Sequence, residues 1–481
     1  MKLSLPEKSV EKFLDQLRQT GSVALTETSR TSDTQPVHTV YGGAHLFRFD
    51  TMQKLGQLSL QSLRDTAPDF ASFARAFELE KAASLPTEAV AIENLTRQLK
   101  LDVEAVRQKN YAAWFAWTIY SRVTDKLARE PVEDYRLDFE DGYGCRADAE
   151  EDQHALTAAT ETARGLVEGT LPRIIGIRLK PLTAELGRRS VRTLDLFLSQ
   201  LLHLTGGRLP GCFLITLPKV ILPEQVSALA GILHLLELQT GLAPGTLKIE
   251  IMIESPRSII SERGEIRLPA LLSAAQGRCV AANFGAYDYS AECNIVAACQ
   301  HLLHPACNFA RQMMQASLAR TGIWLSDGAT GILPVGPHRA RGLQPLSPEQ
   351  LLENRQVVRR AWKIHFDHIR TSLQNGFYQS LDLHPAQLPA RYAAVHSFFL
   401  EHLDNAAARL NNFVSQAAQA TRVGVFFDDA ATGQGLLNFF LRAVRHGAVT
   451  EAEAARLTGL TLAELQSASF IQILNHRQRS G

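Results

Sequence analysis

Short apolar runs that end at or near an ionisable residue recur along this chain at a nearly constant interval. The residues at these ends are Asp138, Arg178, Lys219, Glu254, Asp288 and Asp327. Successive members are roughly 35–40 residues apart, and helical patterns such as 186–204 and 223–239 separate them. Strands that alternate with helices at this spacing form βαβ units, so the sequence predicts a parallel sheet.

Counting every run of this kind gives eight candidate strands. They lie near residues 37–42, 134–140, 173–180, 212–219, 247–254, 278–288, 323–333 and 376–384. Eight parallel strands with intervening helices close into a TIM (β/α)8 barrel, typically of about 250 residues. An open, doubly wound sheet would need a G-x-G-x-x-G turn after an early strand, and none follows these strands. The predicted fold class is therefore α/β, with a TIM barrel over residues 37–390.

Three further parts of the chain have helical patterns. Residues 1–36 are expected to form an N-terminal extension with a helix at 7–20. From about residue 52 to 131, apolar side chains recur at three- and four-residue steps over too long a stretch for one crossover helix, which predicts an all-helical insertion. Residues 391–481 are again helical and are expected to form a cap or an oligomerisation element.

Composition and charge exclude several classes of protein. Of 481 residues, 45% are hydrophobic and 21% are charged, and the net charge is +1, so bulk attraction to nucleic acid or to a membrane surface is not expected. The most apolar region, 211–238, is interrupted by two prolines, a lysine and a glutamate, which argues against a membrane span. The sequence starts with a charged helical pattern rather than a secretory signal, and six cysteines are few for a disulfide framework. We therefore expect a cytoplasmic protein with free thiols.

A cluster of cysteine and histidine residues follows the sixth candidate strand. Its members are Cys293, Cys299, His301, His304 and Cys307. They could bind zinc, but the spacings are irregular and there is no C-x-x-C pair. Small apolar thiols on a helix are the favoured interpretation.

Side chains alternate faces along a strand, which places Glu250 and Glu254 on the same side of the fifth candidate strand. Glu254 is then expected at the mouth of the barrel, and Glu250 deeper inside it. The same alternation places Arg136 inside the barrel on the second strand. Because a buried charge is tolerated when it is paired, we predict an internal ion network around Arg136 and Glu250 and favour a structural role for both.

Glu254 and Asp288 are expected at similar heights on adjacent strands, where their hard oxygen atoms suit Mg²⁺ or Mn²⁺. A Mg²⁺ ion binds one or two protein carboxylates and leaves its other positions to water and substrate. Arg178 and Lys219 lie at the same level on the two preceding strands, and they could bind a substrate carboxylate or a developing oxyanion. The alternative is that these residues are solvated strand ends.

Two further residues are candidates for a general acid or base. His384 closes the eighth candidate strand, but a histidine before a proline is as often a loop anchor. Asp429 could be placed over the barrel mouth by the C-terminal cap, although the pair Asp428 and Asp429 is also typical of the start of a helix.

Six short segments resemble, in the same order, those of the HpcH/HpaI aldolase and citrate lyase β-subunit superfamily. They are Asp138-Phe139-Glu140-Asp141, the Arg178 strand, Leu217-Pro218-Lys219, Ile253-Glu254-Ser255-Pro256, Phe284-Gly285-Ala286-Tyr287-Asp288 and His384-Pro385-Ala386-Gln387. The resemblance covers about residues 37–390. The first strand ends in Tyr41-Gly42-Gly43-Ala44 where the family commonly has a valine-proline-alanine turn, so the chain looks like a divergent member.

The resemblance implies a Mg²⁺-dependent enzyme of carbon–carbon bond chemistry that forms a trimer or hexamer. It implies Glu254 and Asp288 as the metal ligands and Arg178 as a substrate contact. Glu140 and Asp141 match the family's acidic pair that orients metal-bound water beside the substrate.

These features predict a lyase or aldolase that cleaves a 2-oxo acid, such as oxaloacetate, through a metal-stabilised enolate whose oxygen is steadied by Arg178. The base is unassigned, with His384, Asp429 and a metal-bound hydroxide as candidates. Within the same fold, the alternative is a malate synthase-like enzyme that condenses an acyl-CoA thioester. From another class, the alternative is a non-catalytic scaffold with a vestigial barrel.

Overall fold

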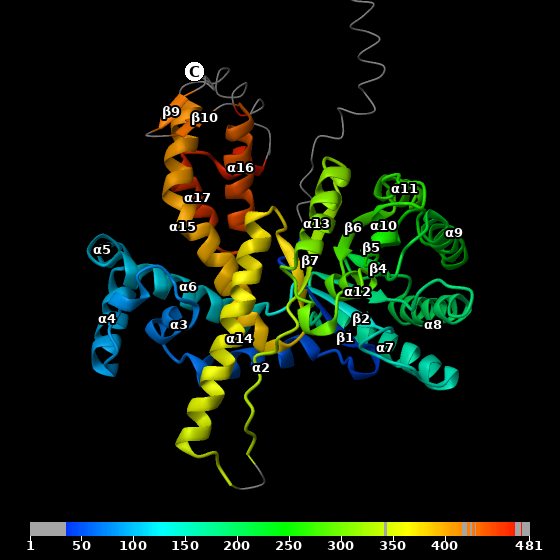
Figure 1. The fold of residues 1–481 in the computed structure, drawn as a ribbon, viewed down its shortest axis with the longest axis horizontal. Helices are drawn as coiled ribbons and strands as arrows, with labels where there is room; N and C mark the ends of the chain where they lie inside the picture. Colours follow the sequence, from blue (N-terminus) through cyan, green and yellow to red (C-terminus); the bar gives the residue numbers. More distant parts are fainter. Residues whose placement is uncertain are drawn as a thin grey trace, which may run out of the picture.

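The computed structural model describes residues 35–340, 344–415, 421–423, 426–428, 430–466 and 473. Eight parallel strands close into a barrel in sequence order, with β8 paired to β1 (Figure 1). The strands are β1 His38–Gly43, β2 Asp134–Asp138, β3 Ile174–Arg178, β4 Phe213–Leu217, β5 Lys248–Ile253, β6 Cys279–Phe284, β7 Trp324–Ala329 and β8 Gln379–Asp382. The TIM-barrel class is confirmed, and each of the eight predicted runs contains one of these strands, although the sixth strand ends earlier than predicted.

The helices that follow β2 to β8 surround the barrel, as a βαβ topology requires. They are α7 Asp148–Glu168, α8 Gly187–Thr205, α9 Pro223–Thr240, α10 Pro256–Ile259, α11 Leu268–Ala274, α12 Ala286–Glu292, α13 Pro305–Leu318, α14 Pro348–Gln374 and α15 Leu388–Ser415, with the short 3-10 helices η3 Ala297–Cys299 and η4 Pro385–Gln387. Among the described residues, none of the helices combines the length and apolar character that a membrane span requires.

The connection between β1 and β2 is a group of helices rather than one crossover helix. It contains η1 Ala44–Leu46, α2 Thr51–Thr66, α3 Phe70–Phe77, η2 Ala82–Ser84, α4 Ala89–Leu101, α5 Val103–Lys109 and α6 Tyr111–Arg129. Helices α3 to α6 lie on one side of α14 and α15, and α7 to α9 lie on the other side (Figure 1). Phe115, Ile119 and Val123 of α6 are fully buried, which explains why the apolar three- and four-residue steps predict helix here.

The C-terminal part continues from α15 into a hairpin and further helices. These elements are β9 Thr421–Val423, β10 Phe426–Asp428, α16 Ala430–Arg445, α17 Glu451–Thr458 and α18 Leu462–Gln466. Arg122 of α6 joins the insertion to this part, because its guanidinium donates to the backbone oxygen of Ala448 and pairs with Glu453 at 2.7 Å. The helix predicted at 7–20 lies outside the described residues.

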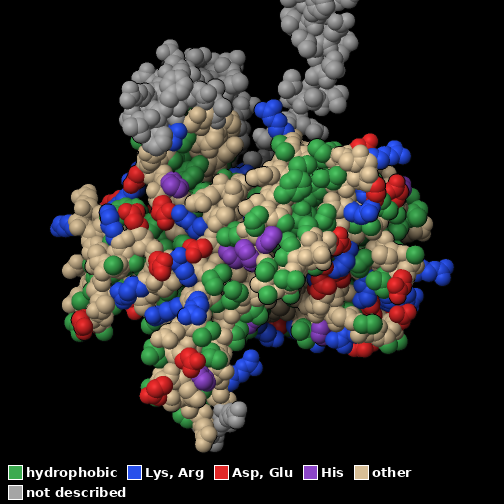
Figure 2. All heavy atoms as spheres, in the orientation of Figure 1, with side chains coloured by type: hydrophobic (Ala, Val, Ile, Leu, Met, Phe, Trp, Pro, Cys, Tyr) green, Lys and Arg blue, Asp and Glu red, His purple; other side chains and the backbone are tan. Residues whose placement is uncertain are grey.

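Surface charge agrees with the near-neutral composition. On the face drawn in Figure 2, basic and acidic side chains of the described residues intermingle and do not gather in one patch of a single sign.

The interior of the barrel holds a polar network below its mouth. Arg136 Nη2 pairs with Glu250 Oε2 at 3.0 Å, its Nε donates to Thr216 Oγ1 at 2.9 Å, and its Nη1 pairs with Asp134. Arg136, Glu250 and Asp134 are fully buried. The predicted internal ion network is therefore confirmed.

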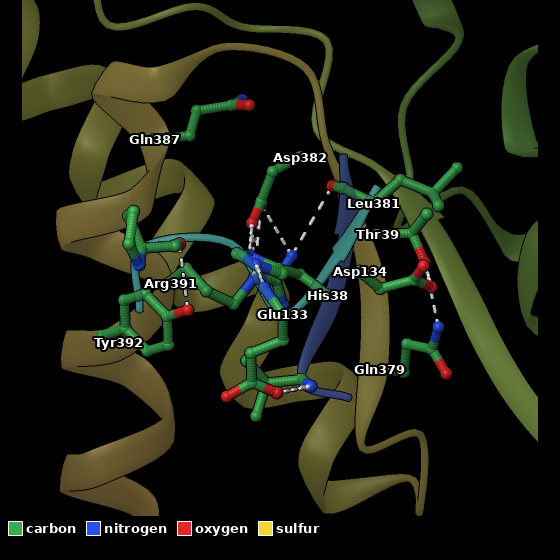
Figure 3. A network of polar contacts seen from close by, with 12 residues as sticks. His38, Thr39, Glu133, Asp134, Gln379, Leu381, Asp382, Gln387, Arg391 and Tyr392 are labelled. Carbon is green, nitrogen blue, oxygen red and sulfur yellow. Dashed lines mark hydrogen bonds and ion pairs between the residues drawn. The ribbon is translucent and has the colours of Figure 1, made fainter. Parts of the chain in front are cut away.

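A second buried network joins the last strand to the first (Figure 3). His38 Nε2 accepts the backbone N–H of Glu133 at 3.1 Å, so its proton is at Nδ1, which donates to Asp382 at 2.7 Å. Arg391 Nη2 and His365 Nε2 also bind Asp382, each at 2.8 Å. Burial alone would raise the pKa of Asp382, but Arg391 and the two histidines outweigh it and hold that pKa well below its usual value.

Candidate active site

The carboxyl ends of β2 to β5 and the start of α12 bring charged side chains together at one end of the barrel. Arg178 is the last residue of β3, and Glu254 directly follows β5. Lys219 lies two residues after the end of β4, and Glu140 lies two residues after the end of β2. This is the face where a TIM barrel presents its functional residues.

Asp138 fixes the positions of two of these side chains. It accepts two hydrogen bonds from Arg178, from Nε at 2.7 Å and from Nη2 at 2.5 Å. It also accepts the backbone N–H groups of Glu140 at 2.9 Å and Gly142 at 2.7 Å, which shapes the turn after β2. Asp138 is not among the site residues predicted from the sequence. Its pairing with Arg178 could have been predicted, because the two residues end neighbouring predicted strands. In the structure they are direct partners in the strand register.

Lys219 lies between acidic residues that follow β2 and an acidic residue of α12. Its Nζ is 3.0 Å from Glu140 Oε1, 3.1 Å from Asp288 Oδ1 and 3.9 Å from Asp141 Oδ1. Its backbone has φ +50°, a left-handed conformation that is uncommon for a residue other than glycine. Burial lowers its pKa, but Glu140 and the neighbouring acids outweigh burial, so the pKa is raised and the ammonium stays charged.

Glu254 is buried, yet neither of its carboxylate oxygens has a hydrogen-bond partner among the described residues. Burial, with Glu140 and Asp288 adding repulsion, raises its pKa to about 8 against the smaller opposing effects of Lys219 and Arg178. A buried polar group without a partner is costly, and such groups are concentrated at functional sites.

Tyr41 of β1 lies against Arg178 and is not among the site residues predicted from the sequence. The guanidinium carbon of Arg178 lies 4.6 Å from the centre of its ring. Tyr41 Oη donates to Glu250 Oε1 at 3.3 Å and accepts from Asn283 Nδ2 at 3.1 Å. Tyr41 therefore connects Arg178 to the buried network of Arg136 and Glu250.

The predicted position of Asp288 on a strand is wrong. β6 ends at Phe284, and Asp288 lies in the first turn of α12 with 45% of its side chain exposed. The apolar run over 278–288 includes the start of this helix, and a short apolar run does not distinguish the two structures. Asp288 nevertheless reaches the cluster through Lys219.

Two other candidates are not brought into this cluster by any described contact. His384 caps η4, where its Nδ1 accepts the backbone N–H of Ala386 at 3.1 Å, and burial lowers its pKa. It lines a cavity of about 520 Å³ between α2 and α14. This is the geometry of a loop anchor, and its catalytic role stays a prediction. Asp429 lies outside the described residues.

The acidic donors fit a hard divalent cation better than zinc. Among the described residues, Glu254 offers two carboxylate oxygens without a hydrogen-bond partner, whereas Asp288 pairs with Lys219, and Glu140 pairs with Lys219 and Arg178. No three His, Cys, Asp or Glu side chains of this part of the chain are assembled as a ligand set, either at the barrel mouth or at the cysteine and histidine cluster. Mg²⁺ needs only one or two protein carboxylates.

Gly285 leaves the space that Glu254 occupies. A Cβ atom at position 285 would lie 2.4 Å from Glu254 Cγ, closer than any stable contact. We expect Gly285→Ala to keep the fold but to displace Glu254 and, if Glu254 is the metal ligand that the sequence predicts, to weaken Mn²⁺ binding by at least about tenfold, since metal sites tolerate little displacement of a ligand. Calorimetric titration with Mn²⁺ measures this, with Gly187→Ala as the control because a Cβ there meets nothing within 4 Å. Unchanged affinity in Gly285→Ala would contradict the prediction.

Comparison with known proteins adds a family and a fold. A family model described as "Domain of unknown function (DUF6986)" matches residues 26–473. The chain belongs to this family. No curated protein matches it. The description of the DUF6986 family names no activity. The predicted relationship to the HpcH/HpaI superfamily therefore remains a resemblance.

Solved structures similar to this DUF6986 chain include a citrate lyase from Burkholderia xenovorans LB400. It has 19% sequence identity and a TM-score of 0.50, over 71% of this chain and 92% of that one. Haloferax volcanii malate synthase in a magnesium and glyoxylate complex has 15% identity and a TM-score of 0.38, over 70% of this chain and 88% of that one. At these identities, the likeness to the citrate lyase shows a shared barrel fold and no more.

Proposed function

We propose that this protein is a Mg²⁺- or Mn²⁺-dependent carbon–carbon lyase that acts on a 2-oxo acid or a related carboxylate. The observation that supports it most is Glu254, whose two buried oxygens find no hydrogen-bond partner in the described part of the chain and lie at the barrel mouth beside further acids. Folding alone gives no reason to bury an unpaired acid, because burial without a partner costs free energy. A ligand that binds these oxygens gives one.

Glu254 and Asp288 are the residues that would hold the cation, which when bound supplies a Lewis acid for the oxygens of a 2-oxo acid. Arg178 is held in advance by Asp138, so its guanidinium needs little reorganisation when it binds a substrate carboxylate or stabilises a developing enolate oxygen. Tyr41 supports the same guanidinium from below. These residues therefore bind and orient an anionic substrate.

The direct test is a screen of 2-oxo acids and their hydroxy-acid adducts, with and without Mg²⁺, followed by mass spectrometry. We expect at least one compound to be cleaved, with cleavage lost after metal chelation and in Glu254→Gln. Consumption of acetyl-CoA and glyoxylate without any cleavage would instead indicate a condensing enzyme. Absence of both turnover and Mn²⁺ binding would overturn the proposal and favour a scaffold.

The pH dependence of metal binding follows from the raised pKa of Glu254. This pKa is about 8, so at pH 6 the carboxyl group is protonated and a cation has to displace the proton. We expect Mn²⁺ affinity to rise about tenfold per pH unit from pH 6 and to level off above about pH 8. Calorimetric titrations at four pH values measure this. Affinity that is flat over this range would show that Glu254 is not a ligand.

The raised pKa of Glu254 also predicts how the stability of the metal-free protein changes with pH. The protonated form is favoured in the fold because the folded pKa, about 8, lies above the unfolded value of about 4.5. This contribution is fully present below about pH 4.5 and is lost as the pH rises through about 8. Bound metal should reverse the loss.

A further inference from the structure

Lys219 is the basic residue that contacts Asp288 among the described residues, and it also contacts Glu140. Its ammonium is 3.1 Å from Asp288 and 3.0 Å from Glu140, and Glu254 is close enough to influence its charge. A single positive group is therefore shared by acids that come from β2, β5 and α12.

The number of charges shows why this ammonium is needed. The acids at the barrel mouth are Asp138, Glu140, Asp141, Glu254 and Asp288, and the basic side chains among them are Arg178 and Lys219. Arg178 binds Asp138 through two hydrogen bonds and also pairs with Glu140 at 3.1 Å and with Asp141 at 3.5 Å, all on the side of β2. Lys219 is thus left to neutralise the side of the cluster that faces Asp288.

The backbone holds Lys219 in this position at a cost. A left-handed conformation is unfavourable for lysine and persists only where surrounding contacts impose it. Here Ser258 Oγ donates to the backbone oxygen of the next residue, Val220, at 2.5 Å, and Gln225 Oε1 accepts the N–H of Ile221 at 2.8 Å. The loop after β4 therefore aims the ammonium at the acids.

We propose that Lys219 is the resident counter-cation of this cluster, and that a divalent cation has to displace its ammonium from Asp288 before Glu254 and Asp288 can bind the metal together. This inference rests on the proposed metal site. A metal ion binds carboxylate oxygens at about 2.0–2.1 Å, so an ammonium on the same Asp288 oxygen would repel it at close range. Displacement also frees the Lys219 ammonium to turn toward a substrate oxygen.

Equilibrium binding of Mn²⁺ to the full chain tests the proposal. Lys219→Met should bind Mn²⁺ at least about tenfold more tightly than the unmodified protein at pH 8, because the competing ammonium is gone. Lys180→Met is the matched control, since Lys180 is another partly buried lysine beyond the neighbouring strand end, where it pairs with Glu151 at 3.0 Å. Removal of that charge should tighten binding by less than about threefold, through general electrostatics alone. Equal or weaker Mn²⁺ binding by Lys219→Met than by the unmodified protein would overturn the proposal.

A second variant distinguishes the effect of the Lys219 charge from that of its hydrogen bonds. It also keeps the test informative if Lys219→Met does not fold. Lys219→Gln keeps N–H donors for the acids but removes the positive charge, so its Mn²⁺ affinity should also rise. In thermal unfolding, both variants should be less stable than the unmodified protein without metal and should gain more from added Mn²⁺. A smaller gain in both variants would contradict the role of Lys219 as a counter-cation.

Failure of the proposed metal site gives a different result. If Glu254→Gln and Asp288→Asn leave Mn²⁺ affinity unchanged, the metal site itself is wrong, whatever the lysine variants do. If these two variants weaken binding and Lys219→Met does not strengthen it, the metal site stands and the displacement of Lys219 is wrong.

Discussion

Replacing Arg136 with methionine is expected to lower the free energy of unfolding by about 3–5 kcal/mol, because it leaves buried acids without their cation. Arg136 is fully buried and binds Glu250, Asp134 and Thr216 inside the barrel. Burial already raises the pKa of Asp134 to about 7 despite the presence of Arg136. Urea denaturation followed by circular dichroism at pH 7 measures the loss.

A surface arginine provides the control for this experiment. Arg129 pairs with Asp125 at 3.2 Å on α6, and 78% of its side chain is exposed. Arg129→Met should therefore change the free energy of unfolding by less than about 0.5 kcal/mol. Combining Arg136→Met with Glu250→Gln should recover part of the lost free energy of unfolding, since it removes one of the buried negative charges that Arg136→Met leaves unpaired. A loss below about 1 kcal/mol for Arg136→Met would mean that water reaches the interior of the barrel.

Glu254→Gln is expected to reduce activity by about 10³-fold or more and to weaken Mn²⁺ binding by about 10²-fold, because it removes the anionic group that we propose as a metal ligand. Stability should not fall. No group in the described part of the chain donates a hydrogen bond to the Glu254 carboxyl, and burial, which raises its pKa to about 8, disfavours its charged form in the fold. Metal-free Glu254→Gln should therefore be at least as stable as the unmodified protein at pH 9.

Loss of activity and Mn²⁺ binding without loss of stability would distinguish a functional acid from a structural one. If Glu254 were structural, its replacement would destabilise the protein, as is expected for Arg136. Asp141→Asn serves as the control within the cluster, because 61% of the Asp141 side chain is exposed and it lies 3.9 Å from Lys219. It should change Mn²⁺ affinity by less than about tenfold. Destabilisation in Glu254→Gln together with normal Mn²⁺ binding would refute the proposed metal site.

The barrel could be predicted from the sequence because its strands repeat at a regular interval and its interior follows a two-residue alternation. The alternation alone placed Arg136 and Glu250 together inside the barrel, 114 residues apart in the chain, and their ion pair is present. Strand ends were less predictable. Residues 286–288 continue an apolar run yet begin α12, since local residue types fit either a strand or a helix start.

The roles of Asp138, Tyr41 and Lys219 depend on information that residue types do not contain. Asp138 binds Arg178 because the parallel register places the two side by side. Tyr41 lies beside Arg178 because β1 pairs with β2 and β2 pairs with β3, the strand that ends at Arg178. Lys219 points at the acids because of a left-handed backbone, which no local pattern predicts for a lysine.

The seam between β1 and β8 has a consequence for synthesis of the protein. His38 and Asp382 are hydrogen-bonded across 344 positions of sequence, and Arg391, which also binds Asp382, comes later still. A nascent chain that has emerged only as far as β7 has two unpaired strand edges, on β1 and β7, and such edges promote aggregation. The barrel therefore closes only after most of the polypeptide has left the ribosome. Until then, the unpaired edges of β1 and β7 have to be covered by helices that have already formed or by chaperones.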